Sequence, residues 1–226
     1  MSARALFVTG AGTDVGKTYV SACLLRGLRA RGLKPNALKP VMTGFDPGDL
    51  ASSDAGRLVA ALGREPTADA VAAVSPFRFT PPLPPTIAAA REDRTLYFRD
   101  VAAACRKAME RDDDFLLIEG VGGVMSPIAE GVKVIDLIDD LEIPTLLVGG
   151  SYIGAASHTL TALAVLEMHN LPVAGLVISE SEHSVTTLGE TLSLIVPFAG
   201  DHKVLTIPRG ADRSADLAEL ALAATA

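Results

Sequence analysis

Lys17 and Thr18 close a glycine-rich segment near the start of the chain, and their types suit the binding of a phosphate and its metal ion. The segment reads Thr9-Gly10-Ala11-Gly12-Thr13-Asp14-Val15-Gly16-Lys17-Thr18. A lysine ammonium in this pattern reaches the β- and γ-phosphates of a nucleotide, and the threonine hydroxyl binds Mg²⁺. Backbone N–H groups of the small residues close around the phosphates. The segment therefore predicts a phosphate-binding P-loop, with an ordinary glycine turn as the alternative.

The loop departs from G-x-x-x-x-G-K-[ST] at one position, because Ala11 stands where the first glycine is expected. The apolar run 5–8 precedes the loop, and a helix-like run, 19–25, follows it. A strand before the loop and a helix after it are the context that the motif requires. We therefore interpret the segment as a variant P-loop, with a helix that begins near Gly16.

Three more charged residues stand where predicted elements begin or end. Lys39 follows a short strand near 36–39, and Glu119 ends the buried strand 115–118. Asp54 stands at the start of a predicted helix, 52–62. Ligands of open α/β sheets bind at the carboxyl ends of the strands, where an acidic residue can hold Mg²⁺ beside a P-loop. The alternatives are a solvated loop cation at Lys39, a helix cap at Asp54 and an unremarkable strand end at Glu119.

The elements that must position these groups alternate between strands and helices. Further strands are expected at 144–148, 173–179 and 204–207, and further helices at 86–91, 98–111, 133–141, 154–169, 186–195 and 214–224. Such alternation predicts an α/β fold with a mainly parallel sheet and helices on both faces. The proline-rich stretch 75–85 is expected to be a rigid surface loop rather than a linker, so residues 1–226 form one domain.

Composition limits the classes of function. The 226 residues are 49% hydrophobic and carry a net charge of −7, which argues against a broad nucleic-acid-binding surface. No apolar run is long enough to span a membrane and no signal peptide is evident, so we expect a cytoplasmic protein. The two cysteines lack metal-ligand spacing and are expected to be reduced thiols. Of the four scattered histidines, only His158 falls near the predicted active edge.

Several segments in this order and spacing resemble those of the dethiobiotin synthetase family. They are the P-loop, Lys39-Pro40-Val41-Met42-Thr43-Gly44, Ser53-Asp54-Ala55, Glu119-Gly120-Val121-Gly122-Gly123 and Gly154-Ala155-Ala156-Ser157-His158. The resemblance extends from the N-terminus to about Ser179. It implies a single-domain P-loop protein that forms a homodimer with active sites at the subunit interface, and no nucleic-acid or membrane partner.

The resemblance also implies an activity. The family joins 7,8-diaminononanoate with CO₂, using ATP and Mg²⁺: one amine becomes a carbamate, ATP phosphorylates it, and the other amine closes the ring of dethiobiotin. The implied catalytic residues are Lys17, Lys39 and Thr13, and the implied metal ligands are Thr18, Asp54 and Glu119. The nucleotide would be bound by Gly12, Thr13, Asp14, Val15, Gly16, Lys17, Thr18, Tyr19, Ser179 and Pro208. The substrate would be bound by Thr43, with Gly154, Ala155, Ala156 and Ser157 holding the carboxylate of a neighbouring subunit's substrate.

Three positions depart from the family pattern. Ser179 stands where family members carry an asparagine that reads adenine, and a serine does not offer a paired donor and acceptor. Ser157 also replaces an asparagine, and Leu205 stands where a glycine is common. We therefore expect weak discrimination between nucleotide bases, with recognition by the backbone near Ile207-Pro208-Arg209 as the alternative.

Three rival functions are weighed against this one. A partition or positioning ATPase of the deviant P-loop type would be a switch on DNA or a membrane. Its signature lysine, five residues before the P-loop lysine, is replaced here by Gly12, and the predicted C-terminal helix has no basic face. A non-catalytic nucleotide-binding module is disfavoured because Lys17, Asp54 and Glu119 are all present. The cobyrinate amidating enzymes carry a glutaminase domain for which this chain is too short.

Overall fold

The computed structural model describes residues 4–226, and a six-stranded sheet forms its centre. The strand order is β10-β9-β8-β1-β5-β2, and every neighbouring pair in this sheet is parallel. The strands are β1 (Arg4–Gly10), β2 (Pro35–Leu38), β5 (Phe115–Glu119), β8 (Thr145–Gly149), β9 (Val173–Ser179) and β10 (Val204–Ile207). The α/β fold with a mainly parallel sheet that we predicted is confirmed.

The sequences of the strands are continuous apolar runs, because helices cover both faces of the sheet and side chains that point either way are buried. Along β1, Phe7 packs into one apolar cluster, whereas Leu6 and Val8 pack into the other. On β5, Ile118 and Leu117 divide in the same way between the two clusters. Successive side chains of a strand point to opposite faces, so the central strands supply two cores at once.

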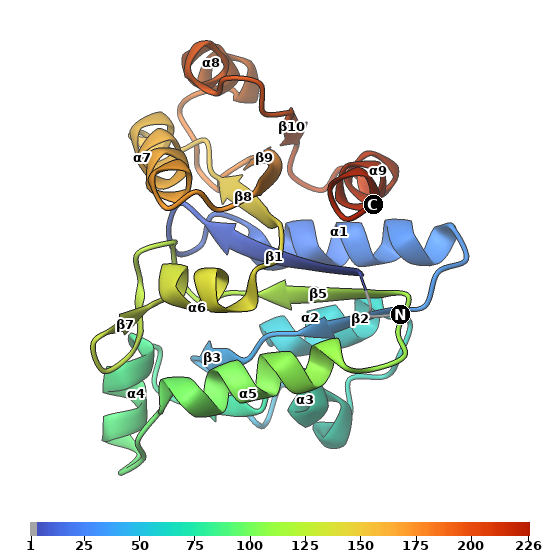
Figure 1. The fold of residues 1–226 in the computed structure, drawn as a ribbon, viewed down its shortest axis with the longest axis vertical. Helices are drawn as coiled ribbons and strands as arrows, with labels where there is room; N and C mark the ends of the chain where they lie inside the picture. The colour runs from blue at the N-terminus through green and yellow to red at the C-terminus, as the bar shows by residue number, and fades with distance from the viewer. Residues whose placement is uncertain (1–3) are drawn as a thin grey trace.

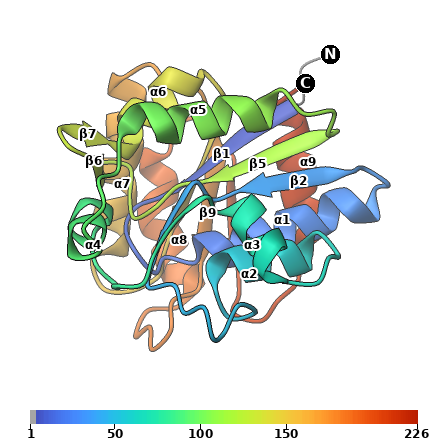
Figure 2. The ribbon, with the colours of Figure 1, turned by 90° about the horizontal axis from the view of Figure 1, so that it is seen from below.

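The helices form a layer on each face of the sheet, as Figures 1 and 2 show. One core includes α1 (Lys17–Ala30), α2 (Asp54–Ala61), α3 (Ala68–Val74) and α9 (Ser214–Ala224). The other includes α4 (Pro85–Arg91), α5 (Phe98–Met109), α6 (Val134–Leu141), α7 (Ala155–Met168) and α8 (Leu188–Ile195). No helix within residues 4–226 has the length and apolar character needed to cross a membrane.

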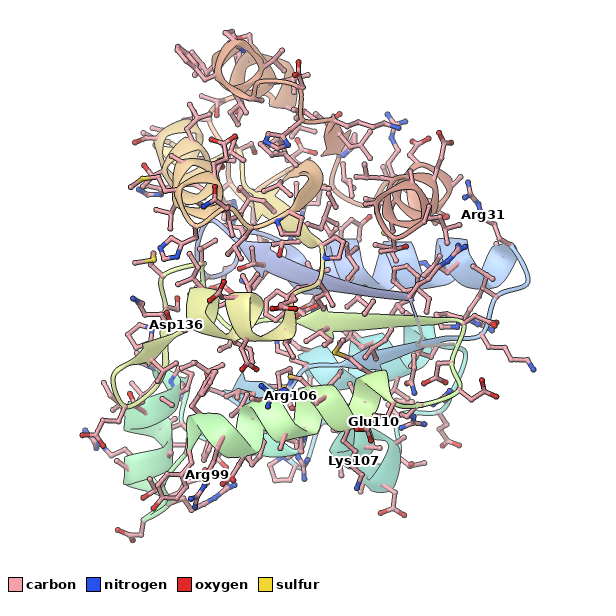
Figure 3. The ribbon with its side chains drawn as sticks, in the orientation of Figure 1. Arg31, Arg99, Arg106, Lys107, Glu110 and Asp136 are labelled. Carbon is pink, nitrogen blue, oxygen red and sulfur yellow. The ribbon has the colours of Figure 1, made fainter. Side chains whose placement is uncertain are left out.

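Helix α5 buries one side of its surface in the core and exposes the other side to solvent. Val101, Ala102 and Cys105 are buried. Figure 3 shows Arg99, Arg106, Lys107 and Glu110 along the same helix, and all four of these side chains are exposed. Apolar residues at helical spacing on one side and charges on the other are what a surface helix requires.

Four features of the local structure differ from the expectations. The proline-rich stretch is not only a loop, because β4 (Phe77–Phe79) within it pairs in parallel with β3 (Val41–Thr43). Helix α3 was not anticipated. A small antiparallel pair, β6 (Pro127–Ala129) and β7 (Val132–Lys133), precedes α6, and a short 3₁₀ turn, η1 (Val196–Phe198), follows α8. These strands have two or three residues, too few to show a period of two in sequence.

Both cysteines are free and buried, as expected for reduced thiols. Burial raises the pKa of the Cys105 thiol to about 12. A thiol that stays protonated is a poor nucleophile and metal ligand, so Cys105 serves as a core side chain.

Candidate functional site

The site lies where the order of the strands changes direction. From β1 the chain builds β2 and β5 on one side, and then crosses to build β8, β9 and β10 on the other. In open α/β sheets the crevice at such a switch point, outside the carboxyl ends of the strands, is where ligands bind. The residues that follow β1 and β8 therefore face each other across this crevice. On the β1 side they form the glycine-rich loop.

The glycine-rich loop ends at the first turn of α1, where Gly16 has a left-handed backbone with φ of 92°. A side chain is also excluded there, because a Cβ on Gly16 would lie 2.5 Å from Oγ of Ser179. No side chain caps α1, so the N–H groups of its first turn stay available to an anion. This is the geometry that the P-loop motif predicts.

Lys17 is buried at the centre of the loop, with its Nζ donating a hydrogen bond of 2.8 Å to the carbonyl of Gly12. Burial, aided by the nearby charge of Lys39, lowers its pKa to about 8. No carboxylate forms an ion pair with Lys17 among the described residues. The ammonium is thus buried without an ion-pair partner, which is unfavourable until an anion binds beside it.

A second group forms around Glu119, which is fully buried at the end of β5. Its Oε1 accepts a hydrogen bond of 2.6 Å from Nζ of Lys39 and one of 2.7 Å from the hydroxyl of Thr18. Lys39 also forms an ion pair of 2.8 Å with Asp54. The ends of β1, β2 and β5, together with the start of α2, therefore bring these four side chains together.

The charges in this group shift each other's protonation. Burial by itself would lower the pKa of Lys39, but Glu119 and Asp54 outweigh it and raise that pKa well above its usual range. For Asp54, burial opposes ionisation, but Lys39 and the hydroxyl of Thr18 lower the pKa of the carboxyl. One cation between two carboxylates leaves a negative charge uncompensated, which is an environment that favours a further cation.

The local structure explains why Asp54 is free to join this group. Ser53, not Asp54, caps α2, since its side chain accepts a hydrogen bond of 3.0 Å from N–H of Gly56. Asp54 is the first residue of the helix, and its side chain points to Lys39. The helix-cap alternative for Asp54 is therefore wrong, and the cap is its neighbour.

The same group has the oxygen donors that Mg²⁺ prefers. Oε2 of Glu119 is buried without a hydrogen-bond partner. The hydroxyl of Thr18 and the carboxylate of Asp54 lie beside it. Residues 4–226 contain no group of three or more His, Cys, Asp or Glu side chains arranged to hold a metal alone. Two carboxylates and a hydroxyl fit Mg²⁺, which keeps several water or phosphate ligands.

The other nucleotide-binding candidates border the loop. Thr13 and Asp14 are exposed on it, Asp14 with a left-handed φ of 57°, and Val15 is buried beneath it. Ser179, at the end of β9, packs against Gly16. A hydrogen bond of 2.6 Å from the Tyr19 hydroxyl to the carbonyl of Ala211 anchors the segment after β10, which begins with the half-buried Pro208.

Within residues 4–226, no hydrogen bond or ion pair joins the substrate-binding candidates to the Glu119 group. Thr43 ends β3, in the small second sheet. Gly154 precedes α7 with a left-handed φ of 91°, and no side chain caps this helix. Ala155 is buried, Ala156 is half-buried and Ser157 is exposed. Residues 154–157 follow β8, at the same edge of the main sheet as the P-loop and across the crevice from it.

Tyr152, the partner of His158 at this crevice, was missed from sequence. The hydroxyl of Tyr152, in the turn after β8, lies 2.8 Å from Nδ1 of His158. The same hydroxyl lies 4.0 Å from where a Cβ on Gly12 would stand. Tyr152 is a single aromatic residue in a turn, and no periodic pattern or motif marks it.

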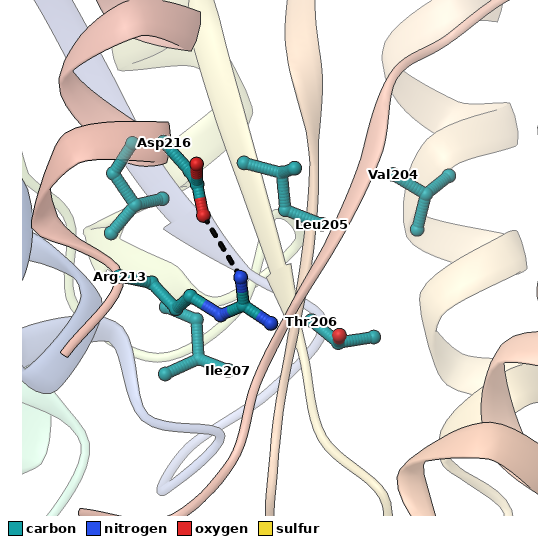
Figure 4. A pocket seen from close by; sticks show the side chains of 7 residues that line it. Val204, Leu205, Thr206, Ile207, Arg213 and Asp216 are labelled. Atoms are coloured by element: carbon teal, nitrogen blue, oxygen red, sulfur yellow. Dashed lines mark hydrogen bonds and ion pairs between the residues drawn. The ribbon is translucent and has the colours of Figure 1, made fainter. Parts of the chain in front are cut away.

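Two hollows lie beside these elements. A cavity of about 440 Å³ between α1 and α2 is lined by alanines and by Thr18, Tyr19, Arg26 and Arg57. A smaller one of about 140 Å³ lies between the outer strand β10 and α9. Figure 4 shows that Arg213 and Asp216, which both line it, bind each other. The crevice at the P-loop therefore remains the site where charged groups converge.

Comparison with known proteins agrees with this geometry. A family model described as an AAA domain matches residues 4–208. The ATP-dependent dethiobiotin synthetase BioD of Caulobacter sp. strain K31 is 47% identical over 98% of this chain and 96% of its own. That of Phenylobacterium zucineum strain HLK1 is 45% identical over 90% and 88%. Among solved structures, a ParA family ATPase from Chlorobium tepidum superposes with a TM-score of 0.53 at 12% identity, covering 98% of each chain. This likeness shows the fold alone.

Proposed function

The chain belongs to the family of ATP-dependent dethiobiotin synthetases, and from this premise we propose how its site performs the reaction. The protein is an ATP-dependent enzyme of biotin synthesis. Its substrates are 7,8-diaminononanoate, CO₂ and ATP with Mg²⁺. One amine takes up CO₂ as a carbamate, ATP phosphorylates that carbamate, and the second amine closes the ring and expels phosphate. The observation that carries the proposal is the contact of Lys39 and Thr18 with Glu119 beside the P-loop.

The main physical difficulty of this reaction is the approach of two anions, a carbamate and a triphosphate. Lys17 is buried without an ion pair, and its ammonium neutralises the β- and γ-phosphates when they enter the loop. Lys39 is held by Glu119 and Asp54, where it can face the carbamate. Thr13 on the exposed loop and Thr43 after β3 donate hydrogen bonds to the carbamate or the phosphates. Charge neutralisation and positioning account for most of the rate.

Thr18, Asp54 and Glu119 would hold Mg²⁺ through their oxygen atoms. When bound, the ion neutralises charge on the phosphate oxygens and orients the terminal phosphate. Gly12, Val15, Gly16 and the first turn of α1 enclose the phosphates with backbone N–H groups. Tyr19, Ser179 and Pro208 border the nucleoside, while Asp14 stays at the exposed rim of the loop.

The test of this function is the product. Purified protein is incubated with diaminononanoate, bicarbonate and Mg-ATP, and the product mass and released phosphate are measured together. We expect dethiobiotin and phosphate in equal amounts. ATP hydrolysis that DNA or lipid vesicles stimulate, without dethiobiotin, would instead support the partition or positioning switch. We disfavour that switch because Gly12 stands in place of its signature lysine, and we expect the enzyme to work in the cytoplasm without nucleic-acid or membrane partners.

Ser179 leads to a prediction about nucleotide selectivity. Its side chain is packed against Gly16 and has one hydroxyl, so it does not offer the paired donor and acceptor of an amide to a base. We expect kcat/KM values for ATP, GTP and CTP that lie within about tenfold of each other, since one missing bidentate pair removes about 1–3 kcal/mol of discrimination. Initial rates of dethiobiotin formation with each nucleotide give these ratios. A preference for ATP above about a hundredfold would contradict the prediction.

We also propose that the enzyme is a homodimer whose active sites lie at the interface. Large apolar side chains are exposed in the loops that follow β5, β8 and β9, with Met125 at 49%, Ile153 at 77% and Val185 at 76%. All three strands end at the edge of the sheet that holds the P-loop. A second subunit seated here would cover this apolar surface, and the Gly154–Ser157 turn would reach the substrate of its neighbour.

Replacing Ile153 by aspartate should therefore weaken the dimer, because a carboxylate would be buried at the apolar contact. We expect the dissociation constant to rise by about 30-fold or more, corresponding to about 2 kcal/mol for a central apolar contact. Light scattering after size-exclusion chromatography measures the mass across a dilution series. Met168→Asp, at the other end of α7 and 81% exposed, is the matched control and should leave the mass unchanged. Equal behaviour of the two variants would place the interface elsewhere.

A further inference from the structure

The proposed reaction must remove protons from its substrate. An alkyl amine near neutral pH is an ammonium group, which has no lone pair to attack with. The amine that closes the ring enters as –NH₃⁺ and leaves as a ureido N–H, so it gives up two protons. Phosphate that departs from the mixed anhydride can accept one of them. The other needs an acceptor before the attack, and this requirement rests on the proposed function.

The charged groups around Glu119 are poorly placed for that role. Oε1 of Glu119 already accepts hydrogen bonds from Lys39 and Thr18, and its other oxygen belongs to the proposed metal site. Asp54 is held by Lys39 at 2.8 Å, and Lys39 keeps its proton. Glu119 and Asp54 each bind a cation, and Lys39 is itself a cation, so these groups are poorly placed to accept a proton.

Tyr152 and His158 form the remaining titratable pair at the crevice. Tyr152 stands on the β8 side of the switch point, with its ring over Gly150 and its hydroxyl beside Gly12. Gly12 carries the carbonyl that accepts the hydrogen bond from Lys17, so this hydroxyl lies next to the loop that would hold the phosphates. Ring centroids of Tyr152 and His158 are 5.7 Å apart, with the rings tilted by 49°.

The relay needs one direction for the hydrogen bond between them. Burial raises the pKa of Tyr152, so its hydroxyl is protonated, and in the His158 tautomer that carries its proton on Nε2 this hydroxyl donates to Nδ1. His158 is in the first turn of α7 and is exposed in the single subunit. The positions of Gly12, Gly150 and Gly154 lie beside the two side chains. No salt bridge within residues 4–226 involves His158.

We propose that Tyr152 and His158 form a proton relay that deprotonates the ring-closing amine. The ammonium gives a proton to the Tyr152 oxygen while the phenolic proton passes to Nδ1 of His158. The freed lone pair attacks the carbonyl carbon of the anhydride, a C–N bond forms, and the C–O bond to phosphate breaks. The departing phosphate takes the second proton from the nitrogen of the new C–N bond. The imidazolium returns its proton to water at the exposed ring edge.

The test compares Tyr152→Phe and His158→Gln with the double variant, measuring dethiobiotin formation at saturating substrates from pH 6 to pH 9. Each single change should lower kcat on the order of 10²-fold at pH 7, the usual contribution of one proton-transfer group. The double variant should be no worse than either single one, because both break the same relay. The loss should shrink as pH rises, since more of the amine is already unprotonated. KM for ATP should stay constant.

A purely structural role for the pair gives a different pattern. If Tyr152 and His158 only hold the start of α7, the losses will not depend on pH or will multiply in the double variant, and either result overturns the proposal. Wild-type kcat in Tyr152→Phe, which keeps the packing of the ring, also overturns it. His169→Gln, at the exposed C-terminal end of α7, is the matched control and should have the wild-type profile. Wild-type protein that forms no dethiobiotin at any pH would instead refute the proposed function.

Discussion

Replacing Lys39 by glutamine should lower kcat by at least about 10³-fold and destabilise the fold as well. The loss of rate follows because a preorganised cation at a developing negative charge contributes about 3–4 kcal/mol or more. Loss of stability follows because Glu119 is fully buried and Lys39 is its cationic partner at 2.6 Å. Removing one partner of a buried ion pair leaves a charge without compensation and costs about 3–5 kcal/mol. Urea denaturation and initial rates measure the two effects.

A second substitution separates these two effects. In a Lys39→Gln/Glu119→Gln variant both charges are gone and two amides face each other, so we expect most of the lost stability to return. Activity should not return, because the cation for the carbamate and the carboxylate for the metal are both missing. Lys107→Gln, on the exposed face of α5, is the control and should change neither quantity by more than about 0.5 kcal/mol. Full activity in Lys39→Gln would remove Lys39 from the mechanism.

Replacing Lys17 by methionine should lower kcat/KM for ATP by at least about 10³-fold but make the folded protein more stable. Lys17 is buried with a carbonyl, not a carboxylate, as its hydrogen-bond partner. Its pKa falls from 10.5 to about 8 mainly through burial, so keeping it charged at pH 7 costs on the order of 3 kcal/mol. Methionine fills similar space without the charge, and we expect a gain of about 1–3 kcal/mol at pH 7.

This gain should depend on pH with a definite sign. Below about pH 8 wild-type Lys17 is charged in both the folded and the unfolded chain, and the full penalty applies. Between about pH 8 and 10.5 the folded protein loses this proton before the unfolded chain does, so the penalty, and with it the advantage of the variant, disappears. Urea midpoints at pH 7 and pH 10 measure the difference. A variant less stable than wild type at pH 7 would show that Lys17 is compensated in the fold.

The two lysines show how much of the site could be predicted from sequence. Lys17 belongs to a contiguous motif in which the strand, the glycines and the helix are all local signals. Lys39 and Glu119 were assigned because each follows an apolar run, and parallel strands end at one edge. Their contact depends on β5 lying between β1 and β2, an order that no local pattern encodes. The resemblance to a known family, not the residues alone, linked them in advance.

Other features had no signal that sequence could supply. The pair β3 and β4 joins three residues on each side across more than thirty positions, and one partner lies in a proline-rich stretch. Helix α3 is a short, alanine-rich helix of seven residues. Its cap, Thr67, is recognisable only once the helix is known. Tyr152 acquires its position from the close approach of the β8 turn to Gly12, which is a tertiary contact.

The position of β2 at the border of the main sheet has a further consequence. This strand has four residues and pairs only with β5, whereas β5 is enclosed by strands on both sides. Outer strands of this kind open by local fluctuation at a lower free energy than the centre of a domain, as amide hydrogen exchange reveals. Lys39 and Glu119 thus lie at the ends of an outer and an inner strand, and their ion pair links the border of the sheet to its interior. Catalytic competence can therefore be lost by a fluctuation that leaves nearly all of the folded domain undisturbed.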